Sequence, residues 1–201
     1  YFQINGGNSK HIEETVTTAK RVIAQTWSIG QRKFPDNYAV REQMFHSIVV
    51  PSITYACEVT GYAEHPKIES QARKYYRWTM GLSQSTRTAT LYDETKTHPI
   101  SVITGCRALR YEERSKESTC RMLRICVEEV QQGVGDKKLI SERESYCRRG
   151  GWSGAAVSAQ IEAGREMSSA IKNRQLEVCE QLNGVKIAKL RYAKVRTPHL
   201  P

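Results

Sequence analysis

Residues 41–81 constrain the fold most, because their apolar side chains recur at helical spacing in two successive segments. In the first segment the apolar positions are Met44, Phe45, Ile48, Val49, Ile53, Ala56 and Val59. In the second segment the positions on one side are Ile68, Ala72, Tyr75, Tyr76 and Thr79. Gaps of three and four residues place each set on one side of a helix. The pattern therefore predicts a helical hairpin with a large buried face.

Prolines and glycines set the boundaries of this hairpin. Pro51 interrupts the first segment and is expected to kink the helix or to end it. Gly61 lies in the predicted turn, and Pro66 follows as the first residue of the second helix. Gly81 comes after the last apolar residue of that helix, so the second arm is expected to end there.

A further helix is predicted before the hairpin, because apolar residues recur at helical spacing over residues 12–27. It is expected to end near Gly30 and to be followed by a basic loop over residues 31–35. Asp36 is the expected N-cap of the hairpin. In the loop, Arg32 and Lys33 either lie in solvent or contact phosphate, and the pattern leaves both readings open.

More helices are predicted after the hairpin. Thr88 is expected to cap a short helix, and Pro99 to start a longer one. Glycines then separate the next two helices, and a long helix is expected over residues 157–182, ended by Asn183 and Gly184. The tail beyond has a pattern that fits a helix, a strand or disorder. No strand is predicted elsewhere, so the expected fold class is all-α.

The charge of the chain favours a polyanionic partner. It has 31 Lys and Arg against 21 Asp and Glu, a formal net charge of +10. The excess is spread along the sequence, and from residue 183 onward five basic residues occur without an acidic one. Clustered positive charge releases counterions from phosphate. The alternating charges of residues 101–150 are more typical of a solvated helix face with ion pairs.

Neither a catalytic nor a metal-binding signature is present. The three aspartates lie in separate predicted turns or helix starts, whereas two-metal chemistry needs acids that converge. There is no phosphate-binding glycine loop and no nucleophile elbow. The six cysteines form no CxxC pair, so we expect reduced thiols in small apolar sites and an intracellular location. We therefore expect no catalytic residue, no metal and no cofactor in this chain.

Several segments, in this order and spacing, resemble the region after the palm in reverse transcriptases of non-LTR (LINE-type) retrotransposons. The matching segments are residues 10–14, 29–36, 45–58, 77–82, 106–112, 146–152 and 189–192. The chain departs from that family at Val59-Thr60-Gly61-Tyr62, where the family usually has a tryptophan. It also lacks the aspartate pair of the palm and the downstream Cys/His knuckle. The resemblance implies a thumb-like helical bundle over residues 1–84 and a helical connecting region with a basic tail over residues 85–201.

The resemblance further implies that the thumb closes over a primer–template hybrid behind the catalytic palm. Such a hybrid tends toward A-form, whose wide minor groove is recognised by shape and backbone contacts. The residues expected to contact this backbone are Arg32, Lys33, Arg73, Lys74, Arg77, Arg87, Lys186, Lys189, Arg191 and Lys194. Tyr75, Tyr76 and Trp78 are expected to fill the core rather than to stack on bases. The expected partners are an RNA–DNA hybrid or RNA and the palm of the same polyprotein. The expected location is the nucleus, and no membrane partner is expected.

Two other functions fit the sequence. An α-helical protein-interaction module derived from such a thumb is the main alternative, motivated by the balanced charges of residues 101–150. It predicts an exposed apolar patch and self-association. A helix-turn-helix DNA reader fits less well, because the arms are long and no short recognition helix follows a three- or four-residue turn.

Overall fold

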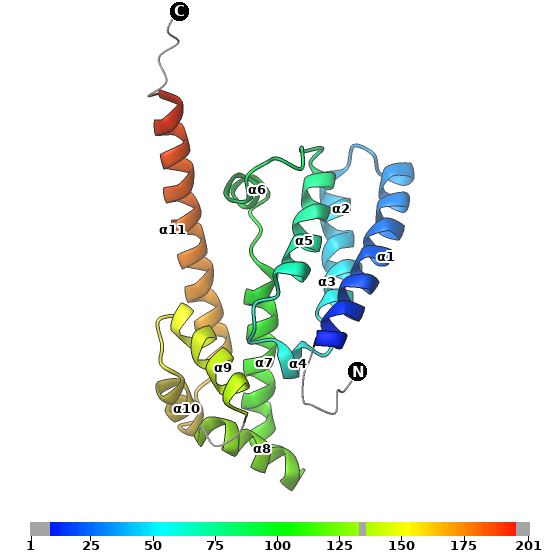
Figure 1. Cartoon of the computed structure of the whole chain (residues 1–201). Coiled ribbons are helices and arrows are strands. Elements are labelled where there is room, and N and C mark those ends of the chain that lie inside the picture. Colours follow the sequence, from blue (N-terminus) through cyan, green and yellow to red (C-terminus); the bar gives the residue numbers. More distant parts are fainter. Residues whose placement is uncertain (1–8, 133–135, 196–201) are drawn as a thin grey trace, which may run out of the picture.

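The structure, a computed structural model, describes residues 9–132 and 136–195, and every regular element in that part of the chain is a helix (Figure 1). The predicted all-α class is therefore confirmed. Within these two ranges, no helix combines the length and the apolar character that crossing a membrane would need. All six cysteines are unpaired, and three of them, Cys57, Cys106 and Cys147, are buried.

The first half of the chain forms a bundle around the predicted hairpin. Its elements are α1 (Ser9–Lys33), α2 (Tyr38–Met44), the π-helical turn η1 (Phe45–Val49), α3 (Val50–Ile53), α4 (Cys57–Thr60) and α5 (Pro66–Thr79). Helices α1 and α5 run side by side in the same direction, and α2, η1 and α3 return between them (Figure 1). The predicted positions of α5, from Ile68 to Thr79, are all buried, and Glu69 is buried as well although its spacing did not predict it.

The first arm of the hairpin is not one regular helix. Pro51 has no N–H for the helical ladder, and the turn before it widens into the π-helical segment η1. The wider turn changes the register of the side chains, so that Ile48 is exposed although its spacing predicted burial. The chain then reverses at Ala56, whose φ of 57° is left-handed, and this turn leaves Val59 exposed as well.

Three predicted boundaries in residues 9–95 are wrong. Helix α1 continues through Gly30 to Lys33, so Arg32 and Lys33 belong to its last turn and not to a loop. Asn37, not Asp36, caps α2, and its side-chain oxygen accepts a bond from the Val40 amide at 3.1 Å. Helix α6 (Thr88–Thr95) begins at Thr88 itself, with Arg87 in the N-cap position.

In the described part of the second half of the chain, six further helices pack beside the first bundle. They are α6 (Thr88–Thr95), α7 (Ile100–Lys116), α8 (Arg121–Gln132), α9 (Lys137–Arg149), α10 (Gly154–Glu162) and α11 (Ser168–Val195). The single long helix predicted over residues 157–182 is divided, because Gly164 adopts a left-handed φ of 76° after α10. Gly184 does not end α11, which continues through the tail to Val195.

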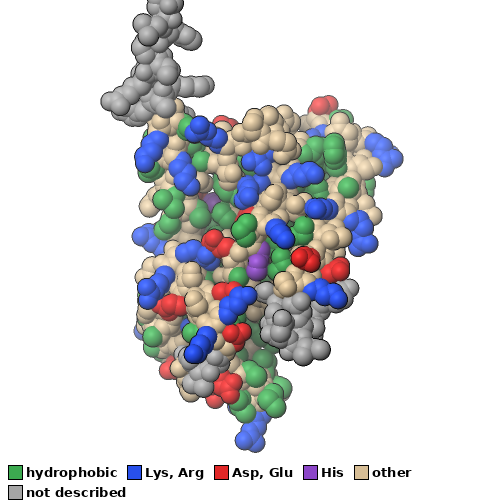
Figure 2. All heavy atoms as spheres, viewed as in Figure 1, with side chains coloured by type: hydrophobic (Ala, Val, Ile, Leu, Met, Phe, Trp, Pro, Cys, Tyr) green, Lys and Arg blue, Asp and Glu red, His purple; other side chains and the backbone are tan. Residues whose placement is uncertain are grey.

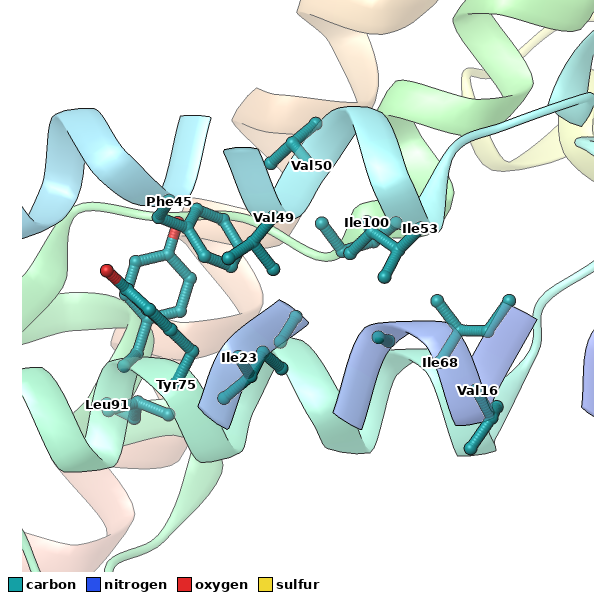
Figure 3. Close-up of a cluster of buried hydrophobic side chains, with 13 residues drawn as sticks. Val16, Ile23, Phe45, Val49, Val50, Ile53, Ile68, Tyr75, Leu91 and Ile100 are labelled. Carbon is teal, nitrogen blue, oxygen red and sulfur yellow. The ribbon is translucent and has the colours of Figure 1, made fainter. Parts of the chain in front are cut away.

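Two apolar clusters form the core. The first joins α1, η1, α3 and α5, with Leu91 and Ile100 contributed by α6 and α7 (Figure 3). The second joins α7 to α9, α10 and the start of α11, and it includes Leu109, Tyr146 and Ile171, all fully buried. Helix α7 contributes to both clusters, and α11 packs along both α7 and α6. A division after residue 84 stays a prediction.

Candidate nucleic-acid interface

Helix ends carrying most of the predicted cations lie at one end of the molecule. The carboxyl ends of α1, α5 and α11 are at the top of Figure 1, with α6 between them. The predicted site residues with exposed side chains there are Arg32, Lys33, Lys74, Arg87, Lys186 and Lys189. We call these six the basic end. Figure 2 shows Lys and Arg scattered over the upper part of this face, whereas most Asp and Glu lie lower.

These cations are not neutralised within the protein. In residues 9–132 and 136–195, none of the six forms a salt bridge. The Arg32 guanidinium instead donates to the Ser28 carbonyl at 3.1 Å and to the Ser28 hydroxyl at 2.6 Å, which holds it along α1. Cations are favoured near helix carboxyl ends, where the backbone dipole is negative. Arg87 stands at the opposite, positive end of a helix, so an anion beside it would relieve the repulsion.

Arg41 positions the loop that follows α1 at this end. Its side chain is buried, and its Nε donates to the Phe34 carbonyl at 2.9 Å. Further bonds from the guanidinium reach the Pro35 carbonyl and, at 3.4 Å, the Thr79 carbonyl. The exit of α1 is thereby joined to the end of α5. This arginine is structural, and sequence periodicity gave no signal for its burial.

The three cations of α5 are not equivalent. Arg77 donates from Nη2 to the Thr86 carbonyl at 2.9 Å, which fastens the loop between α5 and α6. Arg73 is half-buried and lines a cavity of about 380 Å³ together with Tyr92. Burial raises the pKa of Tyr92 to about 12, so this phenol stays neutral. Lys74 alone is exposed, and the structure does not align the three as one outward row.

The last two predicted cations are only partly described. Arg191 and Lys194 belong to the final turns of α11, but their side chains lie outside the described residues. Lys186 and Lys189 precede them on the same helix and are exposed. The tail is thus helical up to Val195, which settles the alternatives that its sequence left open for this stretch.

The predicted aromatic residues divide between core and surface. Tyr75 and Tyr76 are buried as expected, and the Tyr75 hydroxyl donates to the Arg41 carbonyl at 2.7 Å. Trp78 is only half-buried, and its ring lies 5.4 Å from that of Trp27. Trp27 is 47% exposed although its spacing placed it with the core of α1. The surface tryptophan pair is therefore a feature that sequence reasoning missed.

No metal-binding cluster accompanies these cations in the part of the chain that the structure describes, and the expectation of no catalytic residue stays a prediction. No three His, Cys, Asp or Glu side chains there gather as metal ligands would. The expectation of no cofactor stays a prediction. Comparison with protein-family models, with curated proteins and with solved structures found no match to this chain.

Proposed function

We propose that this chain is a nucleic-acid-binding thumb and connecting region of an RNA-directed DNA polymerase, which grips the backbone of an RNA–DNA hybrid or RNA without reading its sequence. The observation that carries the proposal is the basic end. Its exposed cations come from α1, α5, the N-cap of α6 and α11, which are distant in sequence, and none is paired with an acid in the described ranges. The resemblance to non-LTR reverse transcriptases supports the polymerase context.

The physical chemistry of A-form helices agrees with this proposal. Their shallow minor groove offers 2′-hydroxyl groups and phosphates to shape-dependent contacts. Several Lys and Arg side chains on a rigid helical end can approach such a backbone without reading its bases. Neutralising phosphates releases counterions, so affinity is expected to fall linearly with salt on a log–log scale. The proposed partners are the hybrid or RNA and a palm domain, and the proposed location is the nucleus.

A salt-titrated binding series with a charge-reversal variant tests the proposal. Wild-type protein is compared with Arg32→Glu/Lys186→Glu/Lys189→Glu on an RNA–DNA hybrid, duplex RNA, duplex DNA and single strands. We expect the variant to lose most of its hybrid affinity, with a salt slope smaller by about 0.9 for each phosphate contact removed.

A matched control changes the net charge by the same amount at the other end of the molecule. Arg121 and Arg124 on α8 and Lys137 on α9 are exposed, and these helices lie at the bottom of Figure 1. The triple change to glutamate at these three positions should leave most of the affinity and slope intact. Equal losses in the two triple variants would show that only net charge matters, and the proposed interface would be wrong.

A protein-interaction module is the second candidate, favoured by one surface of α8. Met122 is 69% exposed and Ile125 is also exposed, although both are apolar. An apolar helix face of this kind is typical of protein contacts. Sedimentation tests this candidate, because it predicts self-association that Met122→Glu abolishes. A monomer that binds RNA tightly would count against it.

A further inference from the structure

The seam between α1 and α5 presents one face of each helix to solvent. On α5, Lys67, Gln71, Lys74 and Trp78 recur at gaps of three and four residues, so they form one line along the helix. The line is about 16 Å long at 1.5 Å per residue. On α1, Lys20 and Trp27 are seven residues apart and thus share a line as well. The two helices are parallel (Figure 1). The lysines therefore lie nearer the amino ends of both helices, and the tryptophans lie nearer the carboxyl ends.

Contacts with neighbouring side chains fix the position of the tryptophan pair. The rings of Trp27 and Trp78 are 5.4 Å apart with an interplanar angle of 48°. Trp78 also contacts the Tyr75 ring at 5.1 Å, and the guanidinium carbon of Arg41 lies 5.4 Å from the Trp78 centroid. A Cβ at Gly30 would come within 3.2 Å of the Trp78 ring, so the glycine lets α1 approach it closely. Trp78 therefore has little freedom, and it supports the more exposed Trp27 ring as a platform.

The charge along the seam is mainly positive. Lys20 and Lys67 line a groove of about 600 Å³ between the helices, and Glu13 is the one acidic residue among the described residues that line it. In the described ranges, neither these lysines nor Lys74 forms a salt bridge. Figure 2 shows hydrophobic surface between the upper ends of α1 and α5, with Lys and Arg beneath it. Unpaired ammonium groups beside an exposed indole are complementary to an anionic ligand that has flat apolar faces.

We infer that the α1–α5 seam binds a single-stranded stretch of nucleic acid, with one base stacked on Trp27 and phosphates on Lys20, Lys67 and Lys74. A single strand offers free base faces, and aromatic side chains stack on them with little preference for sequence. A duplex hides those faces, so the seam discriminates between the two forms while the basic end does not. The inference rests on the proposed function in that both take nucleic acid as the ligand, but the residues are different except for Lys74.

Binding of a 12-nucleotide oligouridine to the full chain tests the inference. Affinity is read from the anisotropy of a labelled strand, and stacking from the quenching of tryptophan emission. We expect wild-type emission to be quenched, and Trp27→Ala to weaken binding by about tenfold, within the range measured for loss of one stacked base. Trp27→Phe keeps an aromatic face and should lose less than threefold.

Trp152→Ala is the matched control, because Trp152 is 39% exposed but lies on the loop before α10. It should bind like wild type and leave the quenching in place. Melting curves of each variant confirm the fold before binding is compared. Equal affinity of Trp27→Ala and wild type would overturn the inference, as would a Trp27→Phe loss as large as that of Trp27→Ala.

The two proposals fail in distinguishable ways. If hybrid binding depends on the basic-end cations but oligouridine binding does not depend on Trp27, the inferred single-strand site is wrong and the proposed function is supported. If oligouridine quenches the tryptophan emission but no hybrid binding is measurable, the single-strand site is supported and the proposed function is wrong.

Discussion

At the scale of single residues, the most costly side chains to remove are those whose charge is buried. Glu112 and Arg143 form a salt bridge of 2.6 Å, with side chains 7% and 5% exposed. A second bond of 2.9 Å joins Arg143 Nε to Glu112 Oε2, and the Tyr62 hydroxyl donates to the same oxygen at 2.7 Å. This network joins α7 to α9 and to the turn before α5, so its role is structural.

Glu112→Ala should lower the free energy of unfolding by about 3–5 kcal/mol, because it leaves the Arg143 charge buried without its partner. Urea denaturation followed by circular dichroism measures the change. Arg148→Ala is the control, since its ion pair with Glu144 is exposed and surface pairs contribute about 0–1 kcal/mol. A loss for Glu112→Ala no larger than that control would contradict the assignment.

His65 gives stability a dependence on pH. Burial lowers the pKa of His65 below its ordinary value of 6.5, and its Nε2 is buried without a hydrogen-bond partner in the described ranges. The unfolded chain therefore binds this proton more readily than the folded chain does. The contribution of His65 to the free energy of unfolding is complete above pH 6.5 and is lost as the pH falls through the pKa of His65 in the folded protein.

Denaturant midpoints measured between about pH 7 and 5 check this expectation, a range that spans the ordinary histidine pKa. His65→Gln should reduce the loss of stability across that range, because no ionisable group remains at the site. His46 is exposed, so His46→Gln should keep the wild-type dependence. Identical pH profiles for His65→Gln and wild type would show that other groups cause the change.

At the scale of elements, two glycines that look alike in sequence have opposite roles. Gly164 has a φ of 76° and ends α10, whereas Gly184 lies inside α11 with nothing within 4 Å of a Cβ placed there. Gly164→Ala should therefore destabilise the protein by about 1–2 kcal/mol, the cost of a left-handed L-residue. Gly184→Ala should stabilise it by about 0.5–1 kcal/mol through helix propensity.

Urea midpoints of the two variants test this contrast directly. Far-UV circular dichroism provides the second check, since α11 should keep its helix content in Gly184→Ala. Destabilisation of both variants by the same amount would mean that the helix is interrupted at Gly184, as the sequence pattern had indicated.

The elements also show where sequence reasoning reaches its limit. The second arm of the hairpin was predicted correctly, because Pro66 and Gly81 act locally and its apolar residues keep strict helical spacing. The Gly81 amide donates to the Trp78 carbonyl and the Leu82 amide to the Arg77 carbonyl, which closes the helix as glycine there predicts. The first arm was not predicted correctly, because the register of its side chains depends on how the backbone accommodates Pro51 against α1 and α5.

At the scale of the whole molecule, α7 connects two apolar clusters that would otherwise be separate. Gly61 permits the close crossing of α4 over α7, since a Cβ there would overlap the carbonyl oxygens of Cys57 and Thr104. The Thr104 hydroxyl also donates to the Gly61 carbonyl at 3.0 Å. These contacts, with those of α11 on α6 and α7, favour cooperative unfolding of the two halves.

Tryptophan emission can follow each half separately. Trp27 and Trp78 report the first cluster, and Trp152 lies beside the helices of the second. We expect Trp152→Phe and the double variant Trp27→Phe/Trp78→Phe to give urea transitions that coincide with circular dichroism of the same variant. Separate midpoints for the two probes in either protein would show that the halves unfold independently.

The sequence by itself determined the helical class, the buried face of α5 and the excess of positive charge, because periodicity, proline and glycine signals and composition act over a few residues. Only the tertiary structure decided which cations remain free. Arg77 fastens a loop and Arg73 lines a cavity, whereas Arg32 and Lys186 belong to helices, α1 and α11, whose carboxyl ends lie at the same end of the molecule. The exposure of Trp27 was decided in the same way. Helical spacing fixes the side of a helix on which a residue lies, but packing of distant helices fixes whether that side is covered.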